Sequence, residues 1–267
     1  MEFLMFEWAV QLSDDQWADA LSGGGDKVPP MPSTDIQAMF VGSSGRAAFS
    51  EPGIFWTRIK EVMAAQGRPL NKDTRVLDLG VGWGRIYRWM LRDLPASNLT
   101  GIDIDPKTIA MCSEMMPYGD FRHVPAGAPY PTGYDLATAY SVFSHVNDEV
   151  AYAILAEFHR ALNPGGFVAV TTLVPDHVNV WASQVDEEPF KTFLANAKFD
   201  KAEWLDRVAK GGHLYVPTGG GDPARPSETY GEAVAPEGWW TTVEGFKLVE
   251  YSQPLWLPQA LVILQKI

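Results

Sequence analysis

Short apolar runs alternate with amphipathic stretches through the middle of the chain. The apolar runs predict strands at 74–79, 99–103, 120–124, 134–140 and 167–173. Between these runs, apolar residues recur at helical spacing and predict helices at 84–93, 106–116 and 148–162. Such alternation is typical of a doubly wound α/β fold, in which helices cover both faces of a largely parallel sheet.

The first seventy residues predict helices rather than strands. Ser13 is followed three residues later by Gln16, which is the spacing of a capping box. Ser33 predicts the start of a short helix that runs through Phe40, and apolar residues at helical spacing predict a longer helix over 52–66. We therefore expect residues 1–70 to form a helical cap before a core over residues 71–173.

The end of the chain predicts a pair of antiparallel strands. Two apolar segments lie at 246–251 and 260–264, and the link between them is too short for a parallel crossover. We expect residues 246–267 to complete a seven-stranded, mostly parallel sheet whose last strand is antiparallel.

The segment 174–245 has no strong periodicity and is rich in Trp, Pro and Gly. Long irregular segments after a strand often form lids and binding loops. We expect this segment to be a lid that recognises the substrate, with a helical part near 187–209. The turn Asn163-Pro164-Gly165-Gly166 is expected to end the helix over 148–162, just before the strand over 167–173.

Three glycines at alternate positions follow the first strand of the core. Gly80, Gly82 and Gly84 come directly after the run Val76-Leu77-Asp78-Leu79 and before a predicted helix. Glycine lets the backbone take positive φ and approach a ligand closely. The spacing G-x-G-x-G differs from the G-x-G-x-x-G of dinucleotide-binding loops, so it indicates a nucleotide-type ligand other than a dinucleotide.

An acidic residue ends the next predicted strand. A carboxylate at Asp103 can accept hydrogen bonds from both hydroxyls of a ribose. The alternative is that Asp103 or Asp105 caps the following helix, whose first turn suits Pro106. We assign the cap to Asp105 and the ligand contact to Asp103.

Charge and composition narrow the possible partners. The 267 residues carry a formal net charge of −12, which disfavours binding to nucleic acid and to anionic membranes. The one cysteine excludes a disulfide framework and a cysteine zinc site, and no spacing of His and Asp indicates another metal.

An apolar N-terminal stretch without a basic start is not expected to be a signal peptide, so we expect a cytoplasmic protein. The oligomeric state stays open.

The motifs VLDLGVGWG, GIDID, FRHVPAG, YDLATAYSVFSHV and ALNPGGFVAV are together similar to those of one family. They resemble the class I S-adenosylmethionine-dependent methyltransferases, in particular the bacterial enzymes that methylate small molecules such as sugars and natural products. The likeness extends over about residues 40–173 and the terminal strand pair. It implies in-line transfer of a methyl group from S-adenosylmethionine to a hydroxyl or amine of a small metabolite, with S-adenosylhomocysteine as the product.

The resemblance also implies a role for individual residues. Asp78 and Gly80 would border the methionine part of the cofactor, Gly82 and Gly84 would let the backbone approach it, Asp103 would hold the ribose, and Ile104 would pack on the adenine. Ala126 and Gly127 would lie at the adenine edge, Tyr140 and Ser141 near the sulfonium, and Phe40, Gly42 and Arg46 over the methionine end. Many relatives carry an acid at Ala126-Gly127, so here a contact to the adenine amine must come from the backbone or from elsewhere.

Three side chains are candidates for catalysis. His145 follows the fourth strand of the core, where the resemblance places methyl transfer, and either acts as a general base or caps the next turn. His177, past the end of the fifth strand, is a second candidate base, and Tyr140 is a third. Arg46 either pairs with the carboxylate of the cofactor or is an exposed arginine of a turn.

The tryptophans of the insertion have two interpretations. Trp181, Trp239 and Trp240 either stack on an aromatic or sugar acceptor or pack the insertion onto the core.

Other functions make different predictions. A protein or peptide N-methyltransferase would share the fold. A nicotinamide-dependent oxidoreductase predicts G-x-G-x-x-G and a parallel sixth strand, and the sequence favours neither. A non-catalytic S-adenosylmethionine-binding protein predicts loss of the ribose acid or of a loop glycine, yet all of these residues are present.

Overall fold

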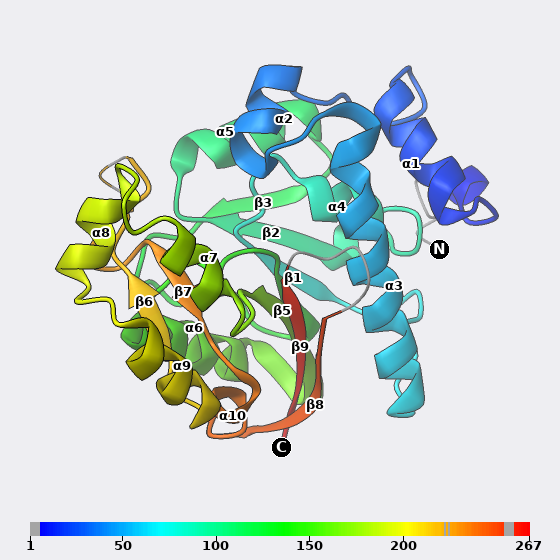
Figure 1. Cartoon of the computed structure of the whole chain (residues 1–267). Helices are drawn as coiled ribbons and strands as arrows, with labels where there is room; N and C mark the ends of the chain where they lie inside the picture. The colour runs from blue at the N-terminus through cyan, green and yellow to red at the C-terminus, as the bar shows by residue number, and fades with distance from the viewer. Residues whose placement is uncertain (1–5, 222, 224, 254–258) are drawn as a thin grey trace. The chain divides into compact units, whose positions relative to one another are not determined.

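The computed structural model describes residues 6–221, 223, 225–253 and 259–267. The chain forms two compact units: a first unit up to Thr138 and a second unit over Ala139–Ile267. The first unit begins with helices, which Figure 1 shows in blue and cyan. They are η1 (Glu7–Ala9), α1 (Asp14–Gly23), α2 (Thr34–Val41), η2 (Gly45–Phe49) and α3 (Ser50–Ala65).

The helix starts predicted at Ser13 and Ser33 are confirmed. The Ser13 hydroxyl accepts a hydrogen bond from the Gln16 N–H (3.2 Å), and the Gln16 side chain accepts one from the Ser13 N–H (2.9 Å). This reciprocal pair satisfies two N–H groups that the first turn of α1 leaves without helical partners. Ser33 caps α2 through one bond only, since its hydroxyl accepts from the Ile36 N–H (3.4 Å).

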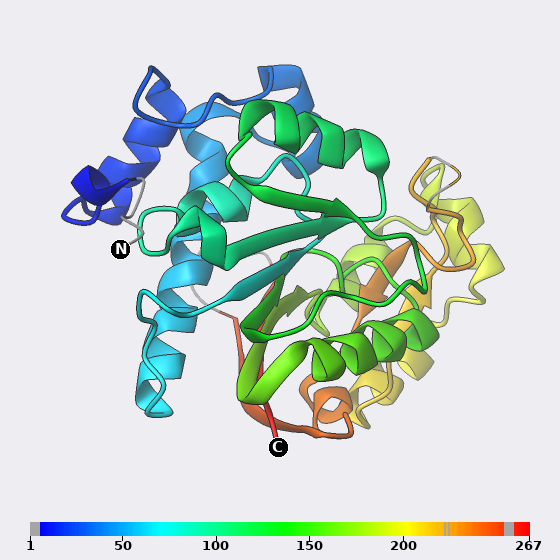
Figure 2. The ribbon, with the colours of Figure 1, turned by 180° about the vertical axis from the view of Figure 1, so that it is seen from behind.

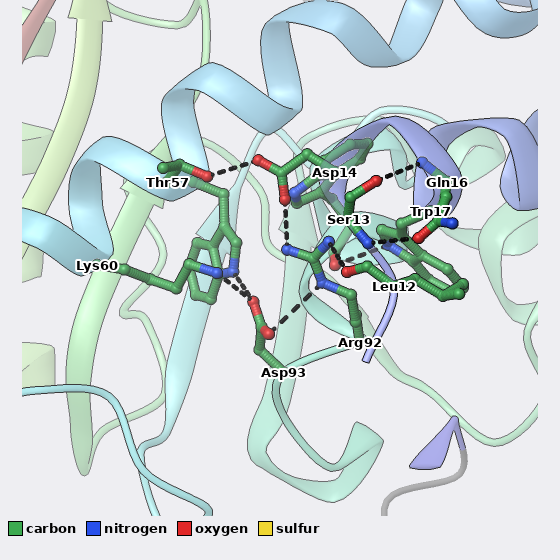
Figure 3. Close-up of polar contacts among 11 residues, drawn as sticks. Leu12, Ser13, Asp14, Gln16, Trp17, Thr57, Lys60, Arg92 and Asp93 are labelled. Carbon is green, nitrogen blue, oxygen red and sulfur yellow. Dashed lines mark hydrogen bonds and ion pairs between the residues drawn. The ribbon is translucent and has the colours of Figure 1, made fainter. Parts of the chain in front are cut away.

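A polar network attaches α1 to the rest of the first unit (Figure 3). The buried Arg92 guanidinium forms an ion pair with Asp14 (2.7 Å) and donates to the Leu12 carbonyl (3.3 Å). The Thr57 hydroxyl of α3 donates to the second oxygen of Asp14 (2.8 Å), and Lys60 pairs with Asp93 (2.9 Å). The segment at Leu12 and Asp14, helix α3 and the pair Arg92-Asp93 are thus linked through polar side chains, of which Arg92 is buried.

Four strands of the first unit pair in the order β3-β2-β1-β4, and every pairing is parallel. They are β1 (Val76–Leu79), β2 (Leu99–Asp103), β3 (Asp120–His123) and β4 (Tyr134–Ala139), with α4 (Arg85–Met90), η3 (Ala96–Asn98) and α5 (Pro106–Met115) between them. Helix α5 connects β2 to β3 and packs against both strands (Figures 1 and 2). Because neighbouring strands run in parallel, the ends of β1 and β2 lie at the same edge.

The second unit contains the other three strands of the seven-stranded sheet, in the order β5-β9-β8. Strand β9 runs antiparallel to both of its neighbours, which confirms the predicted antiparallel close of the sheet. The elements of this unit are α6 (Asp148–Ala161), β5 (Leu162–Thr172), α7 (His177–Ser183), α8 (Phe190–Asn196), α9 (Lys201–Ala209), β6 (Leu214–Val216), β7 (Glu232–Val234), α10 (Glu237–Trp240), β8 (Phe246–Ser252) and β9 (Ala260–Lys266).

Two features of the second unit differ from the prediction. Strand β5 begins at Leu162, so the expected turn at 163–166 lies inside the strand, where Gly165 takes a φ of +69°. Strands β6 and β7 form a separate antiparallel pair that the sequence does not predict, because each has only three residues. Among the described residues, no helix is long and apolar enough to cross a membrane.

Candidate functional site

The glycine loop follows β1 and takes the backbone conformation that the sequence predicts. The φ angles of Gly80, Gly82 and Gly84 are +69°, +53° and +78°. A Cβ at Gly84 would lie 2.7 Å from both Arg88 Nη1 and Met116 Cε. Both its backbone angle and its surroundings therefore require glycine at this position. The loop is tied to β2 because the Gly80 N–H donates to the Ile102 carbonyl (2.8 Å).

Asp103 joins the glycine loop to the end of β2. Its carboxylate accepts hydrogen bonds from the Gly82 N–H (3.1 Å) and the Asp105 N–H (3.0 Å). Asp105 caps α5, since its carboxylate accepts from the Lys107 N–H (2.9 Å), as predicted. A carboxylate offers about four acceptor positions, so a side chain of this type can accept more than two hydrogen bonds.

Asp78 has a buried oxygen without a hydrogen-bond partner among the described residues. The side chain is 3% exposed, and its Oδ1 accepts a hydrogen bond from the Thr138 hydroxyl (2.8 Å). Burial raises the pKa of Asp78 to about 7, and this effect outweighs the opposing hydrogen bond from Thr138. Most buried polar atoms are paired. Asp78 lies on β1, and Asp103 ends the neighbouring strand β2. The unpaired Oδ2 of Asp78 therefore fits a ligand that brings a hydrogen-bond donor or a positive charge.

In the segment before α3, the ring of Phe40 lies on the glycine loop, whereas the side chain of Arg46 is paired with α1. A Cβ at Gly82 would lie 3.4 Å from Phe40 Cδ1, so the Phe40 ring covers the loop at that point. Gly42 ends α2 in the left-handed conformation. Arg46 forms ion pairs with Asp15 (2.5 Å) and Asp19 (2.7 Å) of α1, so its guanidinium already has two carboxylate partners.

The predicted adenine-side residues lie at the ends of β2 and β3. Ile104 is half-buried, and its carbonyl is in hydrogen-bond contact with His123 Nε2 (3.1 Å). Ala126 and Gly127 are exposed, and a Cβ at Gly127 would meet no atom within 4 Å among those described. This edge of the first unit is therefore open.

The second unit contains the candidate catalytic residues, beginning with Tyr140, which is half-buried. Next to it, Ser141 takes a φ of +60°, which is uncommon for a residue with a side chain. The conformation is fixed because the Ser141 N–H donates to Thr171 Oγ1 (2.7 Å) and the Ser141 hydroxyl accepts from Gln259 Nε2 (2.7 Å). The loop that leaves β4 is thus rigidly held.

His145 is fixed between two segments of the second unit. Its Nδ1 is 2.8 Å from the Gly231 carbonyl, and its own carbonyl accepts from the Gly231 N–H (2.7 Å). The ring stacks on Tyr230 at a centroid distance of 5.0 Å. Burial lowers the pKa of His145 and outweighs the hydrogen bond to Gly231, which favours the neutral ring.

His177 is the first residue of α7 and lies beside a carboxylate that the sequence analysis does not single out. Its Nε2 is 3.5 Å from Glu232 Oε2, and the same oxygen accepts a hydrogen bond from Trp181 Nε1 (2.5 Å). Burial alone would raise the pKa of Glu232, but the contacts with His177 and Trp181 outweigh it and lower the pKa. The only sequence signal for Glu232 is an acid in an otherwise apolar and aromatic run after Tyr230.

The tryptophans of the insertion pack inside the second unit. Trp181, Trp239 and Trp240 are at most 4% exposed. Trp239 Nε1 donates to Asp148 (2.7 Å), and Trp240 Nε1 donates to the Ala235 carbonyl (3.0 Å). Of the two interpretations, the structure therefore supports packing of these three tryptophans within the protein rather than stacking on an acceptor. Among the described residues, no three His, Cys, Asp or Glu side chains are placed to hold a metal ion.

The strand order, the antiparallel β9 and the glycine loop are those expected for the fold of class I S-adenosylmethionine-dependent methyltransferases. Consistent with this class, residues 76–166 match the family described as "Methyltransferase domain". The chain is 27% identical over 210 residues to a trans-aconitate 2-methyltransferase of Rhodopseudomonas palustris (strain BisB18), a match that covers 72% of this chain and 75% of the relative. The protein is thus a methyltransferase similar to bacterial enzymes that act on small molecules, and S-adenosylmethionine is its cofactor.

Solved structures show the same fold at low sequence identity. An N-methyltransferase from Bradyrhizobium japonicum WM9 in complex with S-adenosyl-L-homocysteine aligns with a TM-score of 0.52 at 10% identity, over 88% of this chain and 99% of that one. A putative S-adenosylmethionine-dependent methyltransferase from Listeria monocytogenes aligns with a TM-score of 0.51 at 15% identity, over 81% and 98%.

Proposed function

We propose that the first unit binds S-adenosylmethionine at the glycine loop after β1. The orphan oxygen of Asp78 carries this proposal, because it lies beside a loop of positive-φ glycines to which the Asp103 carboxylate is also bonded. Asp103 would hold the ribose, and Asp78 with Gly80 would border the methionine part. The remaining proposed contacts are Phe40, Gly42, Gly82, Gly84, Ile104, Ala126 and Gly127. Arg46 is left out, because Asp15 and Asp19 already engage it.

We propose further that the acceptor is a hydroxyl or amine of a small metabolite, such as a sugar or a natural product. The bound cofactor supplies a methyl group on a sulfonium, which is already activated. The acceptor atom forms a bond to the methyl carbon as the carbon–sulfur bond breaks, and the sulfur keeps the electron pair. Orientation of the acceptor in line with that bond can supply roughly 7–11 kcal/mol.

A hydroxyl acceptor must lose its proton during transfer, and the second unit contains three candidates to accept it: His145, His177 and Tyr140. A general base contributes about 10²–10⁴-fold to such a step. We propose that the segment 174–245 recognises the acceptor. We also propose a cytoplasmic site of action, which the single, buried Cys112 supports.

Calorimetry on the full chain tests the proposed cofactor site. Titration with S-adenosylmethionine and with S-adenosylhomocysteine is expected to give micromolar dissociation constants, which correspond to a free energy of binding on the order of −8 kcal/mol. NADH is expected not to bind, because the loop lacks the dinucleotide spacing. Failure of both sulfur compounds to bind would contradict the proposal. Transfer of label from methyl-labelled S-adenosylmethionine to a panel of sugars, phenols, amines and trans-aconitate then identifies the acceptor class.

A further inference from the structure

Two buried side chains of the first unit donate hydrogen bonds to carbonyl groups of the glycine loop. Cys112 on α5 is fully buried, and its Sγ donates to the Gly82 carbonyl (3.0 Å). Arg88 on α4 is also fully buried, and its Nη1 donates to the Trp83 carbonyl. Two consecutive carbonyls of the loop are therefore held by side chains from two different helices.

The Arg88 guanidinium is buried without a counter-charge. Among the described residues it forms no ion pair with a carboxylate, and its other contacts are the Pro30 carbonyl (2.7 Å) and Met115 Sδ (3.6 Å). Burial lowers the pKa of Arg88 to about 10, so the group stays charged at neutral pH. Burying an unpaired charge is costly, and an apolar side chain would fill the same space at lower cost. The guanidinium is therefore explained by a task that needs its donors.

The Cys112 thiol is suited to a matching task. Burial raises the pKa of Cys112 to about 12, an effect that outweighs the opposing charge of Arg88, so the sulfur keeps its proton. A protonated thiol is a weak hydrogen-bond donor, and its acceptor here is the Gly82 carbonyl. Both side chains thus act on the loop as donors.

The N–H groups of the loop show what this arrangement leaves available. Four of the five N–H groups over 80–84 donate to the Ile102 carbonyl, the Val81 carbonyl or the Asp103 carboxylate. The fifth, that of Trp83, has no hydrogen-bond partner among the described residues. Because buried backbone N–H groups are nearly always paired, the Trp83 N–H fits an acceptor that a ligand supplies.

The direction of the Trp83 N–H follows from the contact with Cys112. The peptide bond between Gly82 and Trp83 is trans, so the C=O of the first residue and the N–H of the second point in opposite directions. The Gly82 carbonyl is directed at Cys112 on α5, so the Trp83 N–H is directed away from α5. Arg88 holds the carbonyl of the next peptide group. The two donors thus fix both peptide groups that flank the Trp83 Cα.

Arg88 also reaches the segment that leads to α2. The Pro30 carbonyl, which accepts from Arg88 Nη2, lies between α1 and α2. Helix α2 carries the Phe40 ring that lies on the loop at Gly82. One guanidinium therefore bonds both to the loop and to the segment that leads to the ring covering it.

We propose that Arg88 and Cys112 are positioning residues of the glycine loop, which hold its carbonyl groups so that the Trp83 N–H donates to an accepting atom of S-adenosylmethionine. This inference rests on the proposed function, since S-adenosylmethionine is the ligand proposed for the loop. Both side chains act through the backbone of the loop, and neither takes part in the transfer of the methyl group.

Calorimetry with S-adenosylhomocysteine on the full chain measures the effect on binding. Arg88→Met removes both carbonyl contacts and keeps an unbranched side chain, so the dissociation constant is expected to rise by about 10-fold. Cys112→Ala should raise it by less, because a thiol is a weak donor. Cys112→Ser keeps a donor and should restore most of the affinity.

Arg92→Met is the matched control for Arg88→Met. Arg92 is also buried, but its guanidinium contacts the Leu12 carbonyl and Asp14 rather than the loop. This variant should lower the free energy of unfolding and leave the dissociation constant nearly unchanged. Equal rises of the dissociation constant in the two arginine variants would overturn the inference, because binding would then follow stability alone.

Ser113→Ala is the matched control for Cys112→Ala. Ser113 is the next residue of α5, and its hydroxyl donates to the Ile109 carbonyl of the same helix (2.9 Å). Its removal should leave binding of S-adenosylhomocysteine nearly unchanged. A larger effect at Ser113 than at Cys112 would contradict the role of the thiol.

Amide hydrogen exchange of the full chain tests the loop without any cofactor. In Arg88→Met and Cys112→Ala, the bonded N–H groups of Gly82 and Gly84 should exchange about 10-fold faster, whereas the two control variants should leave them nearly unchanged. Unchanged exchange in both loop variants would contradict the positioning role. In the unaltered chain, S-adenosylhomocysteine should slow exchange of the Trp83 N–H, and an unaffected Trp83 N–H in the bound protein would contradict its part as the donor.

Arg88→Lys serves as a second variant where Arg88→Met does not fold. Lysine keeps the charge but lacks the planar fork that reaches both carbonyls, so a rise of the dissociation constant is again expected, and an unchanged constant would overturn the inference. Failure of S-adenosylhomocysteine to bind the unaltered chain would refute the proposed function, while the exchange rates would still decide whether Arg88 and Cys112 hold the loop. Binding with equal constants in the loop variants and their controls would refute only this inference.

Discussion

Thr138 donates a hydrogen bond to one oxygen of Asp78 (2.8 Å), while the other oxygen of the same carboxylate is buried and has no partner among the described residues. The two oxygens therefore sit in unequal surroundings. Burial raises the pKa of Asp78 to about 7, so the group changes charge near neutral pH in the protein without ligand.

The stability of the unliganded protein should depend on pH through Asp78. Its folded pKa lies above its unfolded value, so between about pH 4 and pH 7 the folded state holds a proton that the unfolded chain has released. The contribution of this group to the free energy of unfolding is therefore greatest below pH 4 and falls as the pH rises to about 7, by up to about 4 kcal/mol. Urea unfolding of the unaltered chain and of Asp78→Asn across this range measures the effect. Parallel pH profiles for the two proteins would contradict it.

Asp103→Ala should weaken cofactor binding far more than Asp105→Ala. The first change removes the acceptor of the Gly82 N–H and the proposed ribose contact, and a hydrogen bond to a charged group contributes about 1.5–3 kcal/mol. We expect the dissociation constant for S-adenosylhomocysteine to rise by about 10–100-fold. Asp105→Ala removes the cap of α5 and the acceptor of the Thr108 hydroxyl, at about 1 kcal/mol of stability for the cap. Calorimetry that gives equal losses for both variants would speak against a ligand role for Asp103.

Gly84→Ala should destabilise the first unit. At a φ of +78°, alanine would cost about 1–2 kcal/mol in backbone energy alone. Its Cβ would also lie 2.7 Å from Arg88 and Met116, both of which would have to move. Gly127→Ala is a matched control, since it has a similar φ of +77° and open space around the new Cβ. Thermal unfolding should show a clearly larger loss for Gly84→Ala. An equal loss would mean that the neighbours adapt.

Asp14→Asn should loosen α1. The change removes the nearer of the two carboxylate partners of Arg92, whose side chain is 5% exposed, and leaves Asp93 at 3.6 Å. Asp14 itself is 45% exposed, so we expect a loss of about 1 kcal/mol. Asp15→Asn serves as the control, because Asp15 is 89% exposed and its pair with Arg46 is screened by water. Chemical unfolding gives the free energies, and limited proteolysis reports whether cleavage near α1 speeds up. Equal proteolysis of both variants would argue against a role of the network in holding α1.

Much of the first unit could be predicted from the sequence because its signals are local. The capping box at Ser13, the glycines after β1 and the cap at Asp105 each depend on residues a few positions apart. Strand β2 was predicted with its observed bounds, since apolar residues and a terminal acid define it.

The second unit was harder to predict because its contacts join residues far apart in the sequence. The pair of Glu232 with His177 links residues 55 positions apart, and Glu232 lies on a three-residue strand that shows no clear alternation. Arg46 shows the same limit in the first unit: its partners on α1 lie about thirty residues earlier, so the sequence left its role open. The burial of Trp181 depends on Trp204, which no periodicity connects to it.

The insertion has an apolar core of its own, which includes Val178, Trp181, Trp204, Val216 and Val234. Its large aromatic side chains form this core, so the stability of the insertion does not depend on its polar surface residues. Under the role proposed for segment 174–245, substitutions among those surface residues would change which molecules are methylated without altering the glycine loop proposed to hold the methyl donor.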